Sequence, residues 1–133
     1  MHERIDRVLM HLGGTASYFL VGRDVDAFMT THPIDRPAVT TFLLDLLDYI
    51  RTNPIRPPEM RVGVGFSFVG ATKPDPSWAD VLGASDVAAC SYLPGLGTEA
   101  AGLASNIAAD VDILVASVMG KPIVVEEIGR AHV

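Results

Sequence analysis

The chain has 133 residues, hydrophobic residues make up 49% of it, and its formal net charge at pH 7 is −6. This length allows one domain with one core, and it falls well short of the ~250 residues of a complete (β/α)₈ barrel. The acidic balance, with only ten basic residues scattered along the chain, argues against a nucleic-acid-binding surface.

The apolar residues are spread along the chain, and no run approaches the ~18 uncharged residues of a membrane span. Residues 1–7 carry charges of both signs, which is not the pattern of a signal peptide. Cys90 is the only cysteine, so no internal disulfide is expected and the cellular compartment stays open.

The first half of the chain predicts two helices and one strand. Apolar residues at helical spacing predict a helix over residues 3–11, which Gly13 and Gly14 end. The next apolar run predicts a strand over residues 16–21. Asp35 is a candidate N-cap for a longer amphipathic helix that continues to Ile50.

The second half alternates strands and helices. Residues 61–68 predict a strand with glycines at 63 and 65 on one face, which suits the close approach of a neighbouring segment or a ligand. A short helix over residues 77–82, a strand over 87–93 and a helix over 104–119 follow. Residues 122–125 have the continuous β-branched composition of a buried parallel strand.

Four strands separated by helices predict an α/β fold with a parallel sheet in a single domain spanning residues 1–133. Four such strands can form an open three-layer sheet or half of an eight-stranded (β/α)₈ TIM barrel. A flavodoxin-like sheet that binds a small anion is a weaker alternative, because no strand-to-helix turn has the pattern of an anion nest.

Carboxylates follow the first and last predicted strands, where α/β proteins build their ligand sites. Asp24 and Asp26 come after the first strand, and each could instead cap the following segment. Glu126 and Glu127 end the last strand. Because side chains alternate along a strand, we expect only one of this pair to face a barrel interior, and we favour Glu127.

Three strand ends together resemble the clan A glycoside hydrolases, retaining enzymes built on a (β/α)₈ barrel. Residues 18–26 occupy the place of the family's fourth strand, which commonly ends in Gly-Asn-Glu. The sequence Ser91-Tyr92-Leu93-Pro94 is similar to the aromatic context at the end of the sixth strand. Gly120-Lys121-Pro122 followed by Glu127-Ile128-Gly129 resembles the seventh strand.

This resemblance implies that the chain covers the fourth to seventh strands, which make half a barrel. It implies a retaining O-glycosidase that acts on a β-linked carbohydrate, with Glu127 as nucleophile and Asp24 as acid/base. Arg23 and Tyr92 would line the site. Trp78 could stack on a sugar ring, although its position in a short helix favours core packing.

Neither a cofactor nor a metal is implied, since the four histidines lack metal-ligand spacing. The chain departs from the family where Arg23-Asp24 replaces Asn-Glu. Aspartate withdraws the acid by one methylene, and the Arg23 cation favours its ionised form. We therefore expect weak or absent hydrolysis from the isolated chain.

A second interpretation is a non-catalytic half-barrel module. Four parallel strands leave two unpaired edges, and two copies would supply the eight strands of a closed barrel. This interpretation predicts a homodimer.

Overall fold

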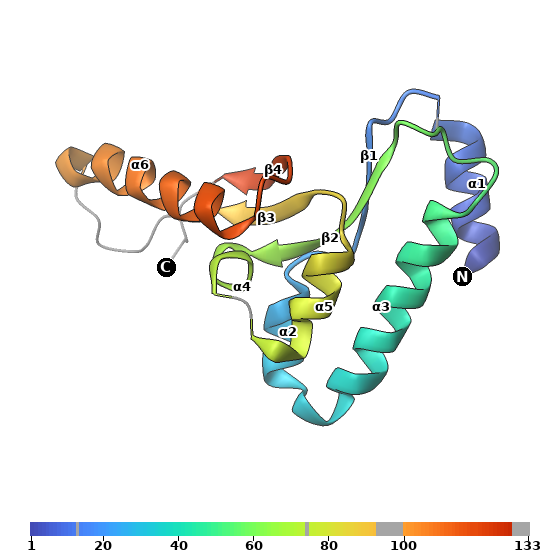
Figure 1. Cartoon of the computed structure of the whole chain (residues 1–133), viewed down its shortest axis with the longest axis horizontal. Helices are drawn as coiled ribbons and strands as arrows, with labels where there is room; N and C mark the ends of the chain where they lie inside the picture. The colour runs from blue at the N-terminus through green and yellow to red at the C-terminus, as the bar shows by residue number, and fades with distance from the viewer. Residues whose placement is uncertain (13, 74, 93–99, 129–133) are drawn as a thin grey trace.

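The computed structural model describes residues 1–12, 14–73, 75–92 and 100–128, without the side chains of residues 100–106, 127 and 128. Its strands are β1 (Tyr18–Val21), β2 (Arg61–Ser67), β3 (Ala88–Tyr92) and β4 (Ile123–Ile128). They form one sheet in the order β1-β2-β3-β4, and every neighbouring pair is parallel. The sheet curls into a half-barrel (Figure 1), which confirms the α/β prediction.

Six α-helices connect or precede the strands in the described part of the chain. They are α1 (His2–Leu12), α2 (Val25–Thr31), α3 (Arg36–Arg51), α4 (Phe68–Thr72), α5 (Pro76–Ala84) and α6 (Ala100–Ser117), with a 3₁₀ helix at Pro33–Asp35. The prediction missed α2 and α4, which have seven and five residues. Helices this short show too few repeats of the apolar spacing to be recognised.

The predicted strand over residues 61–68 ends one residue early for a local reason. The Ser67 side chain accepts a hydrogen bond from the Gly70 backbone N–H at 3.1 Å, which is the bond an N-cap makes. Phe68 therefore begins α4 instead of extending β2.

One face of the sheet carries the hydrophobic core. Val62, Val64 and Phe66 of β2 are fully buried against helices. The helices contribute a set of buried apolar residues that includes Leu47 and Ile50 of α3, Val81 of α5 and Leu114 of α6. Because side chains alternate along a strand, Gly63 and Gly65 lie on the opposite, concave face.

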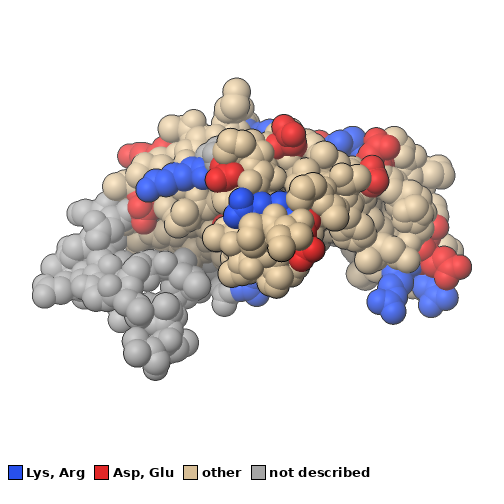
Figure 2. All heavy atoms as spheres, turned by 90° about the horizontal axis from the view of Figure 1, so that it is seen from below, with Lys and Arg blue, Asp and Glu red and all other residues tan. Residues whose placement is uncertain are grey.

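The surface carries both signs of charge. Figure 2 shows acidic and basic side chains interspersed over the described part of the face in view, with no continuous basic stripe. In the described ranges no helix has the length and the apolarity needed to span a membrane.

Candidate functional site

The turn after β1 has an unusual backbone. Gly22 and Asp24 both have positive φ, at 70° and 48°. Glycine adopts this left-handed region freely, whereas aspartate adopts it at a cost in energy. Strained residues of this kind gather at functional sites, so the conformation of Asp24 directs attention to this turn.

The Asp24 carboxylate reaches across the end of the sheet to β3. Its Oδ1 atom accepts a hydrogen bond from the Ser91 hydroxyl at 2.5 Å. Its Oδ2 atom lies 3.8 Å from the Arg23 Nε atom. Asp24 is therefore held at the carboxyl ends of the strands, on the face opposite the core.

Asp26 has a structural role two residues later. It is buried, and its two carboxylate oxygens accept hydrogen bonds from the Ser67 backbone N–H at 2.7 Å and the Ser67 hydroxyl at 2.5 Å. These bonds fix the start of α2 to the end of β2. Asp26 thus anchors the turn that carries Asp24, and it does not cap its own segment.

Strand β4 contains a bulge beside this turn. Cys90 of β3 pairs with Val125, but the next residue, Ser91, pairs with Glu127. Glu126 is therefore an extra residue in β4. Bulges of this kind redirect side chains and often lie next to active sites.

The Glu126 carboxyl lies on the concave face, directly over β2. A Cβ atom added to Gly65 would lie 2.5 Å from Glu126 Oε1 and 2.9 Å from the Gly22 carbonyl oxygen. Only glycine leaves room for this side chain. The glycines of β2 predicted that a neighbouring segment or a ligand comes close to this strand. At Gly65 the group that does so is the Glu126 side chain.

The surroundings of Glu126 favour its protonated form. Burial raises the pKa of Glu126, the Arg23 cation lowers that pKa, and the Asp24 carboxylate raises it again. Its Oε2 atom is buried and accepts no hydrogen bond from any described residue. Asp24 and Glu126 thus act on one another electrostatically, although 101 residues separate them in the sequence.

Glu127 lies in β4 by its backbone, but its side chain lies outside the described residues, as does Gly129 of the same motif. The bulge removes one premise of the sequence argument, because regular alternation does not hold where an extra residue is inserted. Glu126, which that argument disfavoured, is the carboxyl observed on the concave face.

Tyr92, expected to line the site, points to the α6 side of the sheet. Its hydroxyl donates a 2.6 Å hydrogen bond to the Asp110 Oδ2 atom of α6, and its ring packs edge-on against Phe68. Burial and the Asp110 carboxylate raise the pKa of Tyr92 to about 12. The neighbouring Ser91 faces Asp24, and adjacent strand residues face opposite sides of a sheet.

Trp78 is a core residue, which is the interpretation that its place in a short helix favoured. Its side chain is 8% exposed within the core, and its Nε1 atom donates a hydrogen bond to the Gly70 carbonyl at 3.1 Å. This hydrogen bond links α5 to α4, and the side chain is too buried to stack on a sugar.

Cysteine chemistry is disfavoured at this site. Cys90 is fully buried. Burial, with the charges of Glu126 and Asp24, raises the pKa of its thiol, and the thiolate is the reactive form. Among the side chains that the structure describes, no three His, Cys, Asp or Glu residues gather as a metal-ligand group.

No protein family, curated protein or solved structure matches this chain. The resemblance to glycoside hydrolases therefore rests on the motif residues. What the geometry adds is a carboxyl with a raised pKa beside a second carboxyl that accepts a hydrogen bond, which is the chemistry of a proton donor and its partner.

Sequence reasoning missed Ser91 and passed over Glu126. The glycine at 65 was the usable signal for Glu126, because it marked a place where something approaches β2 closely. Nothing in the sequence marks the bulge in β4.

Proposed function

We propose that this chain carries the site of a retaining O-glycosidase acting on a β-linked carbohydrate, with its carboxyl pair at the carboxyl ends of β1 and β4. The observation that supports this proposal best is the position of the Glu126 carboxyl, which lies over Gly65 and beside the Gly22 carbonyl, in the turn that also carries Asp24. Glycosidases use two carboxyl groups, one to protonate the leaving oxygen and one to attack the anomeric carbon or stabilise its charge.

The local environments favour different roles for the two described carboxyls. A general acid must hold its proton near neutral pH, and burial favours the protonated form of Glu126. Asp24 accepts the Ser91 hydrogen bond and lies beside the Arg23 cation, which suits the anionic partner. The family resemblance assigns Glu127 as nucleophile and Asp24 as acid/base instead.

Hydrolysis by a single copy should be weak. The concave face of a half-barrel is open on the side where four further strands would complete a pocket, and water exclusion strengthens the electrostatic interactions that catalysis uses. If Asp24 is the acid/base, as the family resemblance implies, the Arg23-Asp24 pair in place of Asn-Glu weakens hydrolysis further.

Two substrates with different leaving groups test the assignment. In an aryl β-glycoside of a strongly acidic phenol, the phenolate leaves without being protonated. The alkoxide of an alkyl β-glycoside is a poor leaving group and needs a general acid. We expect Glu126→Gln to slow the alkyl glycoside by about 10²-fold or more and the activated aryl glycoside far less. Loss of the nucleophile slows both substrates. Asp24→Asn should do so if Asp24 is the nucleophile, and Glu127→Gln should do so if the family assignment holds.

Glu59→Gln is the matched control, because Glu59 is an exposed glutamate in the loop before β2. It should leave both rates unchanged. Asp24→Glu, which restores the methylene of the family's glutamate, should increase turnover if Asp24 is the acid/base. A folded protein that hydrolyses no aryl β-glycoside, and whose Asp24 and Glu126 signals are unmoved by added β-oligosaccharide, would contradict the proposal.

A further inference from the structure

The half-barrel leaves both edges of its sheet open. In the described part of the chain, β1 pairs only with β2 and β4 pairs only with β3. Each outer edge therefore presents a row of unpaired backbone N–H and C=O groups, which makes it a template for another parallel strand.

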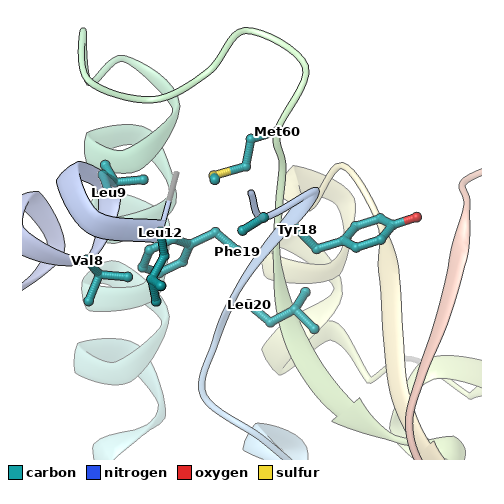
Figure 3. Close-up of a pocket in the computed structure, with 8 residues that line it drawn as sticks. Val8, Leu9, Leu12, Tyr18, Phe19, Leu20 and Met60 are labelled. Carbon is teal, nitrogen blue, oxygen red and sulfur yellow. The ribbon is translucent and has the colours of Figure 1, made fainter. Parts of the chain in front are cut away.

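An apolar groove runs along the β1 edge. It has a volume of about 220 Å³ and lies between α1 and β1, where Val8, Leu12 and Phe19 line it. Figure 3 shows these side chains on the α1 side of β1, while Tyr18 and Leu20 point the other way. Val8 and Leu12 are 40% and 55% exposed, so α1 has apolar surface that its own chain does not cover.

The β4 edge is also apolar. Val125 is 41% exposed, on the same face of β4 as α6. Val111 of α6 lines the adjacent cavity and is half-exposed. The β4 edge therefore has an unpaired strand and exposed apolar side chains that could cover the groove at the β1 edge of another copy.

The exposed charges of the two helices differ in sign. α6 contains Asp110 and Asp112 and no basic residue. α1 contains two acids, Glu3 and Asp6, as well as Arg4 and Arg7. Asp6 accepts hydrogen bonds from Tyr49 and Asn53 of its own chain, so the two exposed arginines outnumber the one fully exposed acid, Glu3. A helix pair formed by α1 of one copy and α6 of another therefore places a weakly positive surface beside an acidic one.

We infer that the partner at these edges is a second copy of this chain, with β4 of each copy pairing in parallel with β1 of the other and α1 packing beside the partner's α6. The two seams are equivalent by a two-fold axis and close an eight-stranded barrel, so assembly stops at two copies. Each concave face would then face the other and be shielded from water. The inference does not depend on catalysis by Asp24 or Glu126.

Mass measurement by size-exclusion chromatography with light scattering tests this inference. At roughly micromolar concentration the wild type should have twice the chain mass of 14.2 kDa. A monomer, or an open series of higher oligomers, would overturn it.

Charged substitutions locate the seam. Val8→Glu on α1 and Val125→Lys on β4 should each weaken the dimer by about 100-fold or more, because a symmetric dimer buries the unpaired charge twice. Met10→Glu is the matched control, since Met10 is 66% exposed on the same helix but does not line the groove. Circular dichroism checks that each variant is folded.

Mixing the two variants gives a result that misfolding cannot imitate. A heterodimer of Val8→Glu with Val125→Lys has one wild-type seam and one seam in which the glutamate meets the lysine. The mixture should recover dimer mass that neither variant has by itself. Variants that stay dimeric, or a mixture that stays monomeric, would overturn the proposed seam. Because these mass measurements do not use turnover, a monomeric wild type would overturn the dimer and leave the glycosidase proposal to be judged by its own substrate test.

Discussion

Removal of the Asp26 carboxylate should loosen the turn that holds Asp24. Asp26 is 6% exposed and accepts hydrogen bonds from the Ser67 N–H at 2.7 Å and the Ser67 hydroxyl at 2.5 Å. Hydrogen bonds to a charged group contribute about 1.5–3 kcal/mol, and a buried donor left unpaired costs about 1–3 kcal/mol. Because these two costs overlap, we expect Asp26→Ala to lower the free energy of unfolding by about 2–4 kcal/mol.

Asp26→Asn keeps the shape of the side chain and part of its hydrogen bonding, so it separates the contribution of the charge from that of the packing. The asparagine carbonyl can still accept from the Ser67 N–H, and the Ser67 hydroxyl can rotate to accept from the amide. We therefore expect a smaller loss of about 1 kcal/mol. An alanine variant only as destabilised as the asparagine variant would mean that the carboxylate does not anchor α2.

Urea unfolding followed by the fluorescence of Trp78, the only tryptophan, measures these differences. All samples should have one protein concentration, since self-association changes apparent stability. Asp45→Ala is the control, because Asp45 is exposed on α3, and it should stay within about 0.5 kcal/mol of wild type. A similarly small effect of Asp26→Ala would refute the reasoning.

Three further predictions concern the surroundings of the site. Gly65→Ala should cost about 1–3 kcal/mol, because its Cβ would meet Glu126 Oε1 and the Gly22 carbonyl; chemical denaturation measures this, and an unchanged midpoint would contradict the packing. Glu126 has a raised pKa, so the stability that its protonated form gives is complete below its ordinary value of 4.5 and is lost as the pH rises through the folded pKa. Glu126→Gln should therefore have the same free energy of unfolding as wild type in acid and a higher one at neutral pH. Urea unfolding at both pH values measures this, and a difference between the two proteins that does not change with pH would contradict it. Lys121→Met should lower stability by about 1–3 kcal/mol, since the Lys121 ammonium donates to the carbonyls of Leu82, Gly83 and Ser85; thermal unfolding measures it, and a neutral effect would mean these bonds are not formed in solution.

The sequence predicted the long elements because their patterns repeat. The helix now seen as α3 shows its apolar spacing over four turns, and β4 begins with a β-branched run over residues 123–125. The same reasoning failed for α2 and α4, which are too short to show a repeated pattern, and the place of α2 also depends on contacts that are distant in sequence. The bonds from Asp26 to Ser67 span 41 residues, and no local pattern encodes them.

The candidate site was predicted in part. Its position at the ends of β1 and β4 follows from parallel topology, and Asp24 was named from its place after a strand. The choice between Glu126 and Glu127 depended on regular alternation, which the bulge at Glu126 interrupts. Tyr92 was assigned by motif, but its direction is set by the Asp110 hydrogen bond on the core side.

Lys121, a residue of the motif, has a structural role in this fold. The Gly-Lys-Pro motif supported the glycosidase resemblance. In the structure the Lys121 side chain bonds the last carbonyls of α5 and the loop after it, as cations at helix C-termini do. This role holds whether or not the protein cleaves sugars.

The carboxyl titration of Glu126 in wild type and in Asp24→Asn, followed by NMR, tests most directly whether two distant carboxylates meet on the concave face. Burial and the negative charge of Asp24 both raise the pKa of Glu126. The Glu126 pKa should therefore lie above its ordinary value in wild type and fall when Asp24 becomes neutral. An ordinary Glu126 pKa, or one that Asp24→Asn leaves unchanged, would contradict the site.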